Sequence, residues 1–278
     1  MIDISKLAPD TLGFNALVLG APGSGKTTSL VTLAKAGLEV FVAFTEQGVN
    51  NLRKGMRVHD LTPEEQARIH YTYISPARGS FAKRAKGARD INRAAKFGDM
   101  VSGSRKDHDQ FVQLLEVCAD FIDQNGESFG AVDTWGPDRV FAIDGMSGLN
   151  DMCMALVIGD KPCASQQDWG IAMNQEGGFI KECANSECNF VLLGHLEQEK
   201  DEVSGRMIVT ASALGRKLGP TIGKDFQDVI LAEQSTKGYI WSTEDARIQL
   251  KYSNLPQGTR LTPSFVPLVE HWLEENQA

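Results

Sequence analysis

A short segment near the amino end of the 278-residue chain has residue types and spacing that suit phosphate binding. It matches the pattern G-x-x-x-x-G-K-[ST] through Gly20, Ala21, Pro22, Gly23, Ser24, Gly25, Lys26 and Thr27, and Thr28 follows. Glycines let the backbone aim N–H groups at a phosphate, and the next helix adds its positive amino end. Lys26 supplies a charge for the β- and γ-phosphates, and the Thr27 hydroxyl suits Mg²⁺. The segment predicts a site for ATP with Mg²⁺.

Apolar runs along the chain place this loop and three other polar side chains at one edge of a sheet. The strand-like run "ALVLG" precedes the loop, and "TSLVTLAKAG" follows it with helical spacing. Three further runs, "VFVAFTEQG", "RVFAIDGMSG" and "NFVLLGHLEQ", read as buried strands that end in Glu46, Asp144 and His195. Parallel strands present ligand groups at their carboxyl ends. We therefore expect an α/β fold, a mostly parallel twisted sheet with helices on both faces.

These three side chains suggest different chemistry at the predicted site. Asp144 is placed to bind Mg²⁺ through its water shell. Glu46 could accept a proton from the attacking water or orient it, and His195 could sense the γ-phosphate as a neutral hydrogen-bonding group. The simpler alternatives are a helix-capping aspartate, a surface glutamate at a strand end and a structural histidine.

The charge of the chain is unevenly distributed. Its net charge of −8 argues against general nucleic-acid binding, because such affinity comes from neutralising phosphates. Residues 78–106, however, contain nine Lys or Arg against two Asp, with Lys83, Arg84 and Lys86 close together. Arg216 and Lys217 lie in a second, glycine-containing region after the apparent hairpin "KDEVSGRMIV". Both regions are candidates for contacts to single-stranded DNA, and a solvated face or a subunit-contact arm is the alternative for the first.

The spacing of the motifs predicts one domain over residues 1–278 with an insertion at approximately 53–106. The 117 residues between Lys26 and Asp144 exceed what one strand, one helix and their connections use. Within them, "HDQFVQLLEVCADFIDQNG" predicts an amphipathic helix with Phe111, Leu114, Leu115, Cys118, Phe121 and Ile122 on one face. At the carboxyl end, "TPSFVPLVEHWLEENQA" predicts a short helix that packs through Val269 and Trp272.

The order of these motifs resembles the core of the RecA-like ATPases, specifically the single-domain proteins of bacteriophages and, among these, the Sak-type recombination ATPases associated with single-strand annealing. Three further stretches are similar to that family: "QQDWGIAMNQ", "SALGRKLGPTIGKDFQDVILAE" and "RIQLKYSNLP". Lys251 in the last one matches a basic residue that reaches the neighbouring subunit's nucleotide. Ser253 stands where the family usually has a second basic residue.

The resemblance implies a Mg²⁺-dependent ATPase in which Lys26 and Thr27 bind phosphate and metal and Asp144 supports the metal. It further implies that Glu46 activates water, His195 senses the γ-phosphate and Lys251 completes a site between subunits. The implied partners are single-stranded DNA, further copies of the chain in a ring or filament, and a single-strand-binding protein or other replication or recombination protein. Two rival readings are a P-loop small-molecule kinase and a nucleotide-switched adaptor such as a helicase-loading module.

The sequence also predicts where the protein works. The residues near its start lack the basic head and apolar run of a secretory signal. No apolar segment approaches the roughly 20 residues that span a bilayer. We therefore expect a cytoplasmic protein without a membrane partner, in the host cytoplasm if a phage encodes it.

Overall fold

The structure is a computed structural model. It describes residues 6–8, 11–74, 85, 89, 108–159, 161, 163–200, 207–236 and 238–277.

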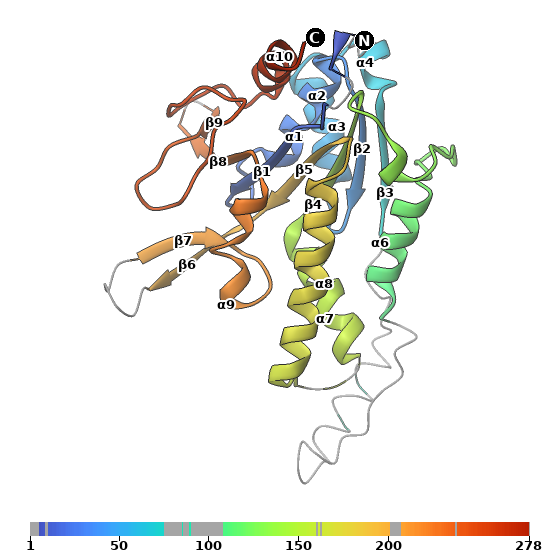
Figure 1. The fold of residues 1–278 in the computed structure, drawn as a ribbon, viewed down its shortest axis with the longest axis vertical. Coiled ribbons are helices and arrows are strands. Elements are labelled where there is room, and N and C mark those ends of the chain that lie inside the picture. Colours follow the sequence, from blue (N-terminus) through green and yellow to red (C-terminus); the bar gives the residue numbers. More distant parts are fainter. Residues whose placement is uncertain are drawn as a thin grey trace.

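Seven strands of the described chain form one twisted sheet in the order β3-β2-β4-β5-β1-β8-β9 (Figure 1). The strands are β1 (Asn15–Gly20), β2 (Glu39–Phe44), β3 (Ile69–Tyr73), β4 (Arg139–Asp144), β5 (Asn189–Gly194), β8 (Asp228–Ser235) and β9 (Gly238–Ser242). All neighbours pair in parallel except β8 and β9. The continuous apolar runs of β1, β4 and β5 are buried along nearly their whole length, as expected for strands covered on both faces.

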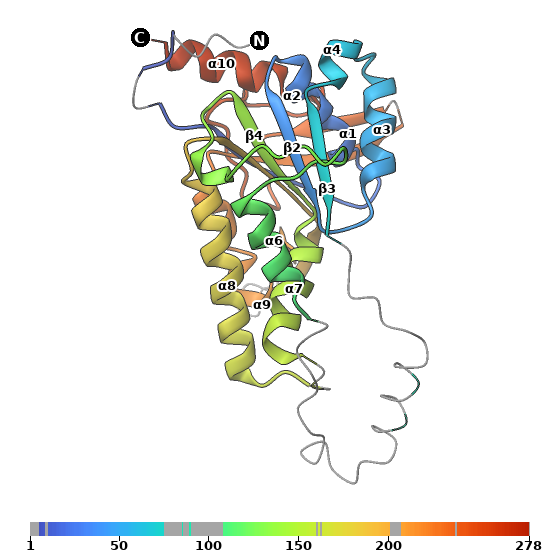
Figure 2. The same cartoon turned by 90° about the vertical axis from the view of Figure 1, so that its right-hand side faces the viewer.

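Helices cover both faces of the sheet, and Figure 2 shows the two helix layers with the sheet between them. One face packs against the helices α1 (Lys26–Ser29), α2 (Val31–Lys35), α3 (Val49–Val58), α4 (Pro63–Gln66) and α10 (Val266–Glu275). The other packs against α6 (Gln110–Ala119), α7 (Met146–Ile158) and α8 (Gln166–Ala184). Each face has its own apolar core, built on alternate residues of the same strands. The predicted α/β architecture is therefore confirmed.

A two-stranded antiparallel hairpin projects from this body after β5 (Figure 1). It consists of β6 (Leu196–Lys200) and β7 (Met207–Ala211), so the hairpin expected around "KDEVSGRMIV" is confirmed. The short helix α9 (Gly215–Leu218) follows it, and a 3-10 turn over Ile222–Asp225 leads into β8. Another 3-10 turn, Val132–Thr134, precedes β4.

Two predicted helices compare differently with the structure. The carboxyl-terminal helix α10 buries Val269 and Trp272 as expected. The helix expected from residue 108 onward ends at Ala119, earlier than its pattern suggests. The chain turns there because the carboxylate of Asp123 accepts hydrogen bonds from the N–H groups of Asn125 and Glu127. Leu115 lies within α6 and is still 41% exposed, so the predicted apolar face is wrong at this position, and Ile122, beyond the end of the helix, is 48% exposed.

The segment assigned to an insertion, approximately 53–106, is described only in its first part. Residues 53–73 complete α3 and form α4 and β3, and β3 is an edge strand of the main sheet. Lys83, Arg84 and Lys86 lie outside the described residues. The limits of the insertion remain a prediction. None of the described helices combines the length and apolar character that crossing a bilayer requires.

Candidate nucleotide site

The loop between β1 and α1 has the backbone shape of an anion-binding turn. Gly23 and Gly25 adopt φ angles of 80° and 88°, which side-chain-bearing residues rarely adopt. Such left-handed residues set among ordinary ones build the concave nests of N–H groups that bind phosphate. The hydroxyl of Ser24 in this loop is buried and has no hydrogen-bond partner among the described residues. The loop therefore has the shape and an unsatisfied polar group that a phosphate would suit.

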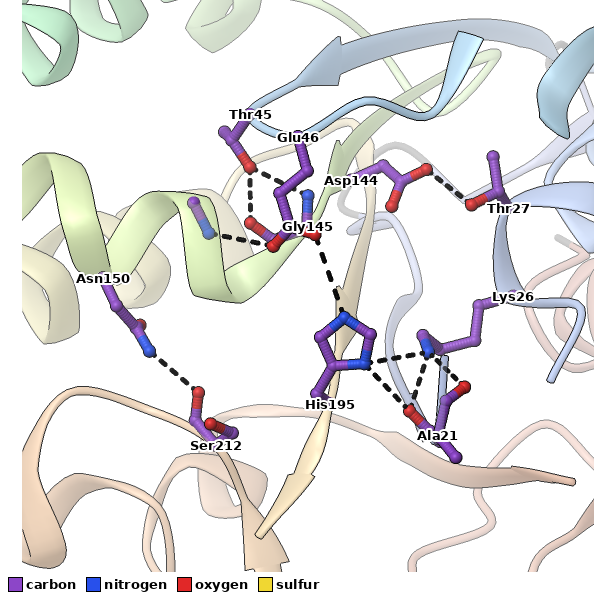
Figure 3. Close-up of polar contacts among 12 residues, drawn as sticks. Ala21, Lys26, Thr27, Thr45, Glu46, Asp144, Gly145, Asn150, His195 and Ser212 are labelled. Carbon is purple, nitrogen blue, oxygen red and sulfur yellow. Dashed lines mark hydrogen bonds and ion pairs between the residues drawn. The ribbon is translucent and has the colours of Figure 1, made fainter. Parts of the chain in front are cut away.

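Lys26, the first residue of α1, directs its ammonium back over this loop (Figure 3). Its Nζ donates to the carbonyl oxygens of Gly20 at 2.7 Å and Ala21 at 3.1 Å. Burial lowers the pKa of this lysine to about 8, although the nearby carboxylates of Asp144 and Glu46 oppose the shift. Near neutral pH the group remains mostly protonated, so it can supply a positive charge to a phosphate chain.

Thr27 and Asp144 meet between α1 and the carboxyl end of β4 (Figure 3). The Thr27 hydroxyl donates to Oδ2 of Asp144 at 2.7 Å. Burial raises the pKa of Asp144 to about 6, while the Thr27 hydrogen bond opposes that shift. A hydroxyl and a carboxylate are hard oxygen ligands, and Mg²⁺ typically uses one or two such groups together with water and substrate phosphates. The pair therefore fits a magnesium ion bound to a nucleotide.

Glu46 follows β2 and is positioned by the neighbouring strand end. The Thr45 hydroxyl accepts a hydrogen bond from the Gly145 N–H and donates one to the Gly145 carbonyl oxygen. Thr45 precedes Glu46 and Gly145 follows Asp144, so these bonds hold the two carboxylates at neighbouring strand ends. Oε1 of Glu46 accepts a hydrogen bond from the Gly148 N–H at 3.0 Å. The His195 imidazole and that N–H together lower the pKa of Glu46, although burial opposes them. Glu46 is thus an ionised carboxylate at neutral pH and can accept a proton.

His195 lies directly after β5, between Lys26 and Glu46 (Figure 3). Its Nδ1 is 3.5 Å from Nζ of Lys26 and 3.3 Å from the Gly20 carbonyl oxygen. Its Nε2 is 3.8 Å from Oε2 of Glu46. The imidazole therefore lies between the lysine that faces the phosphate loop and the carboxylate that could activate water.

The cavity above the loop holds about 230 Å³ and is bordered by Lys26, Thr27, Glu46, Asp144 and His195, with the residues 22–25 and Thr28 of the loop. Ligand pockets usually measure roughly 300–1,000 Å³. The enclosed space therefore suits a phosphate chain and its metal better than a whole nucleotide. Together with the loop shape and the oxygen ligands, this size fits the triphosphate part of a nucleotide with Mg²⁺.

Several residues that border the cavity were not predicted from the sequence. Gln47, Asn51 and Lys54 line it from the segment before α3 and from α3 itself. Tyr239 lines it from β9. No sequence motif marks these positions, because their approach depends on how α3 and the β8–β9 hairpin pack around the loop.

The remaining predicted residues lie elsewhere. Lys251 pairs with Val229 near the amino end of β8, and its Nζ donates to the carbonyl oxygens of Gly223, Lys224 and Phe226. It does not border the cavity of its own chain. Arg216 and Lys217 belong to the short helix α9.

Comparisons with known proteins give little further information. No protein-family model matches the chain, and no curated protein sequence matches it. Among solved structures, the chain is similar to one described as "Crystal structure of the RadB recombinase", with a TM-score of 0.41 and 12% identity. The match covers 85% of this chain and 84% of that one. At this level of similarity we transfer neither residue roles nor an activity from it.

Proposed function

We propose that the chain is a RecA-like ATPase that hydrolyses ATP with Mg²⁺ and couples this to single-stranded DNA binding in phage-type recombination or strand annealing. The observation that carries the proposal is the meeting of Lys26, Thr27, Glu46, Asp144 and His195 at one cavity above a phosphate-binding loop. The motif order in the sequence resembles that of the RecA-like ATPases of phages. The coupling to DNA rests on this resemblance and on the two basic regions of the sequence.

Binding and charge stabilisation are assigned to the loop and the residues beside it. The loop backbone and the Lys26 ammonium hold the β- and γ-phosphates, where negative charge is greatest. Thr27 and Asp144 would hold Mg²⁺, which neutralises charge on the β- and γ-phosphate oxygens when bound. Fixed charges of this kind need no reorganisation during the reaction and are usually a large contribution to the rate.

Water activation is assigned to Glu46 and its neighbours. The ionised Glu46 accepts a proton from a water that attacks the γ-phosphorus in line with the leaving oxygen. The Gly148 N–H fixes one carboxylate oxygen, and His195 lies beside the other. His195, between Glu46 and Lys26, would hydrogen-bond to the γ-phosphate and so report its presence.

The proposal extends to partners through charged residues outside the cavity. Lys83, Arg84 and Lys86 belong to a strongly basic stretch, and Arg216 and Lys217 follow the β6–β7 hairpin. These residues would contact phosphates of single-stranded DNA. Lys251 would act on a neighbouring subunit in a ring or filament, since it lies away from its own cavity. A single-strand-binding protein or another replication or recombination protein remains a candidate partner.

The test of this proposal is steady-state ATP hydrolysis measured with and without single-stranded DNA. We expect hydrolysis that requires Mg²⁺ and rises severalfold with DNA. An ATP hydrolysis rate that does not change with DNA would contradict the coupling to DNA, while the proposed nucleotide site would stand. Transfer of the γ-phosphate to a small acceptor instead of water would favour the kinase reading. Nucleotide-dependent partner capture without turnover would favour the adaptor reading.

Salt dependence tests which basic residues contact DNA. Replacing Lys83, Arg84 and Lys86 with Gln should weaken binding and reduce the slope of log K against log salt by about 2, since each lost phosphate contact on a single strand removes about 0.7. The matched comparison is replacement of Arg216 and Lys217. An unchanged slope in one variant would exclude that region from the DNA contact.

A further inference from the structure

The strand order gives the cavity two chemically different sides. The strands β2, β4 and β5 all lie on one side of β1, the strand that leads into the phosphate-binding loop. At or just after their carboxyl ends stand Glu46, Asp144 and His195. The strands β8 and β9 lie on its other side. If the cavity binds a nucleoside triphosphate as proposed above, the terminal phosphate lies toward the carboxylates and His195. The nucleoside half then extends toward the β8–β9 side.

Tyr239 is the residue of that side that borders the cavity. It lies near the start of β9, opposite Gln234 of β8, in the antiparallel hairpin. A Cβ atom placed on Gly25 would be only 2.8–3.1 Å from three carbons of the Tyr239 ring. The ring therefore rests directly on the phosphate-binding turn, and only a glycine at position 25 leaves room for it. The side chain is half-buried, so part of the ring remains accessible.

The chemistry of this side differs from that of the opposite one. Glu46 and Asp144 present carboxylates on that opposite side, whereas Tyr239 presents an aromatic ring. An aromatic ring stacks on any nucleobase, and such contacts typically change affinity by roughly 5- to 100-fold per base. Because the cavity of about 230 Å³ is smaller than most ligand pockets, a nucleoside would extend out of it past this half-buried ring.

We propose that Tyr239 binds the nucleoside half of the substrate by stacking its ring on the base or the ribose. This inference rests on the proposed nucleotide site and names the part of the ligand that the β8–β9 hairpin recognises. In this account the two parts of the nucleotide are bound by different groups of one cavity. The phosphate-binding loop binds the phosphate chain, and Tyr239 binds the nucleoside.

The experiment compares Mg²⁺-dependent binding of ATP, ADP and inorganic tripolyphosphate to the wild type, Tyr239→Ala and Tyr239→Phe. Tyr252→Ala, which removes an exposed tyrosine outside this cavity, is the matched control. We expect Tyr239→Ala to weaken ATP and ADP by roughly 5- to 100-fold and tripolyphosphate by less than about twofold. Tyr239→Phe should bind all three ligands nearly as the wild type does, since the ring is kept.

Equal loss of ATP and tripolyphosphate in Tyr239→Ala would overturn the inference, because the ring would then act only by shaping the loop. Unchanged ATP affinity would overturn it as well. Should Tyr239→Ala fail to fold, Tyr239→Trp retains a ring, and its fluorescence should change with ATP and not with tripolyphosphate. An identical response to both ligands would contradict the inference. A wild type that binds neither ligand would contradict the proposed function itself.

Discussion

Two buried carboxyl groups of this protein have different surroundings. Asp144 lies at the carboxyl end of β4, and Glu176 lies in the middle of α8. Burial raises the pKa of both, to about 6 for Asp144 and about 7 for Glu176. The magnitude of a pKa shift therefore does not distinguish the two sites.

The difference lies in what surrounds each carboxyl group. Asp144 accepts a hydrogen bond from Thr27, has Lys26 and His195 nearby, and borders a cavity. Glu176 is fully buried, accepts one hydrogen bond from the Leu214 N–H at 3.0 Å, and has no partner for Oε1 among the described residues. A perturbed carboxyl group indicates a functional site where other polar groups and an open cavity meet it. Among the described residues, Glu176 has only the Leu214 N–H as a hydrogen-bond partner and does not border the cavity beside Asp144, so we assign it to the core.

Lys26→Ala, which removes the cation near Asp144, should lower turnover more than a change at either of the two carboxyl groups. The variant leaves the γ-phosphate without its nearest side-chain cation, so kcat for ATP should fall on the order of 10²- to 10³-fold. The measurement is phosphate release at saturating ATP. Lys35→Ala, on the exposed face of α2, is the control and should retain wild-type turnover. Wild-type turnover in Lys26→Ala would contradict the assignment of Lys26 as the cation that binds the γ-phosphate.

Asp144→Asn should have a smaller effect, concentrated in the metal dependence. Loss of the carboxylate charge should raise the Mg²⁺ concentration for half-maximal turnover about 10- to 100-fold, as is typical for residues that hold a metal through water. Asp138→Asn, at the opposite end of β4, serves as the control. If the Mg²⁺ titration were unchanged in Asp144→Asn, Asp144 would have no role in metal binding and would be, like Glu176, only a buried carboxyl group.

Glu176→Gln should leave turnover unchanged and alter stability with pH. In the folded protein Glu176 keeps its proton up to a pH of about 7, whereas the unfolded chain releases it near 4.5. The wild type therefore loses stability as the pH rises from about 4.5 to 7, by at most about 3 kcal/mol. Because Gln does not titrate, the variant should match the wild type near pH 4, below the unfolded-state pKa, and be more stable at pH 8.

Denaturant unfolding of both proteins at pH 4 and pH 8 measures this difference. Glu182→Gln, an exposed position on the same helix, should show none. If Glu176→Gln instead reduced ATP turnover while remaining folded, the contrast between the two carboxyl groups would be wrong.

The parts of the site that depend on local pattern could be predicted from the sequence. The phosphate loop is a contiguous motif, and Glu46, Asp144 and His195 each end a recognisable apolar run. Their meeting followed from one rule, that parallel strands expose their carboxyl ends together. The structure places all three beside Lys26.

The parts that depend on packing could not be predicted. Tyr239 reaches the loop only because β9 folds back on β8, and the sequence gives no signal that its ring covers Gly25. Glu176 sits in a helix stretch rich in polar residues and glycine, "NQEGG", which suggests exposure, yet the segment after β7 covers it. The early end of α6 depends on a turn held by Asp123, and its apolar pattern continues beyond that turn.

The most direct measurement of the central claim is single-turnover ATP hydrolysis by Glu46→Gln beside its nucleotide affinity. We predict an ATP Kd within about threefold of the wild type and a hydrolysis rate lower by about 10²- to 10⁴-fold, the usual contribution of a general base. Glu39→Gln, at the amino end of the same strand, should hydrolyse ATP normally. Equal hydrolysis rates in Glu46→Gln and the wild type would contradict the assignment of this cavity as the site of ATP hydrolysis with Glu46 as its base.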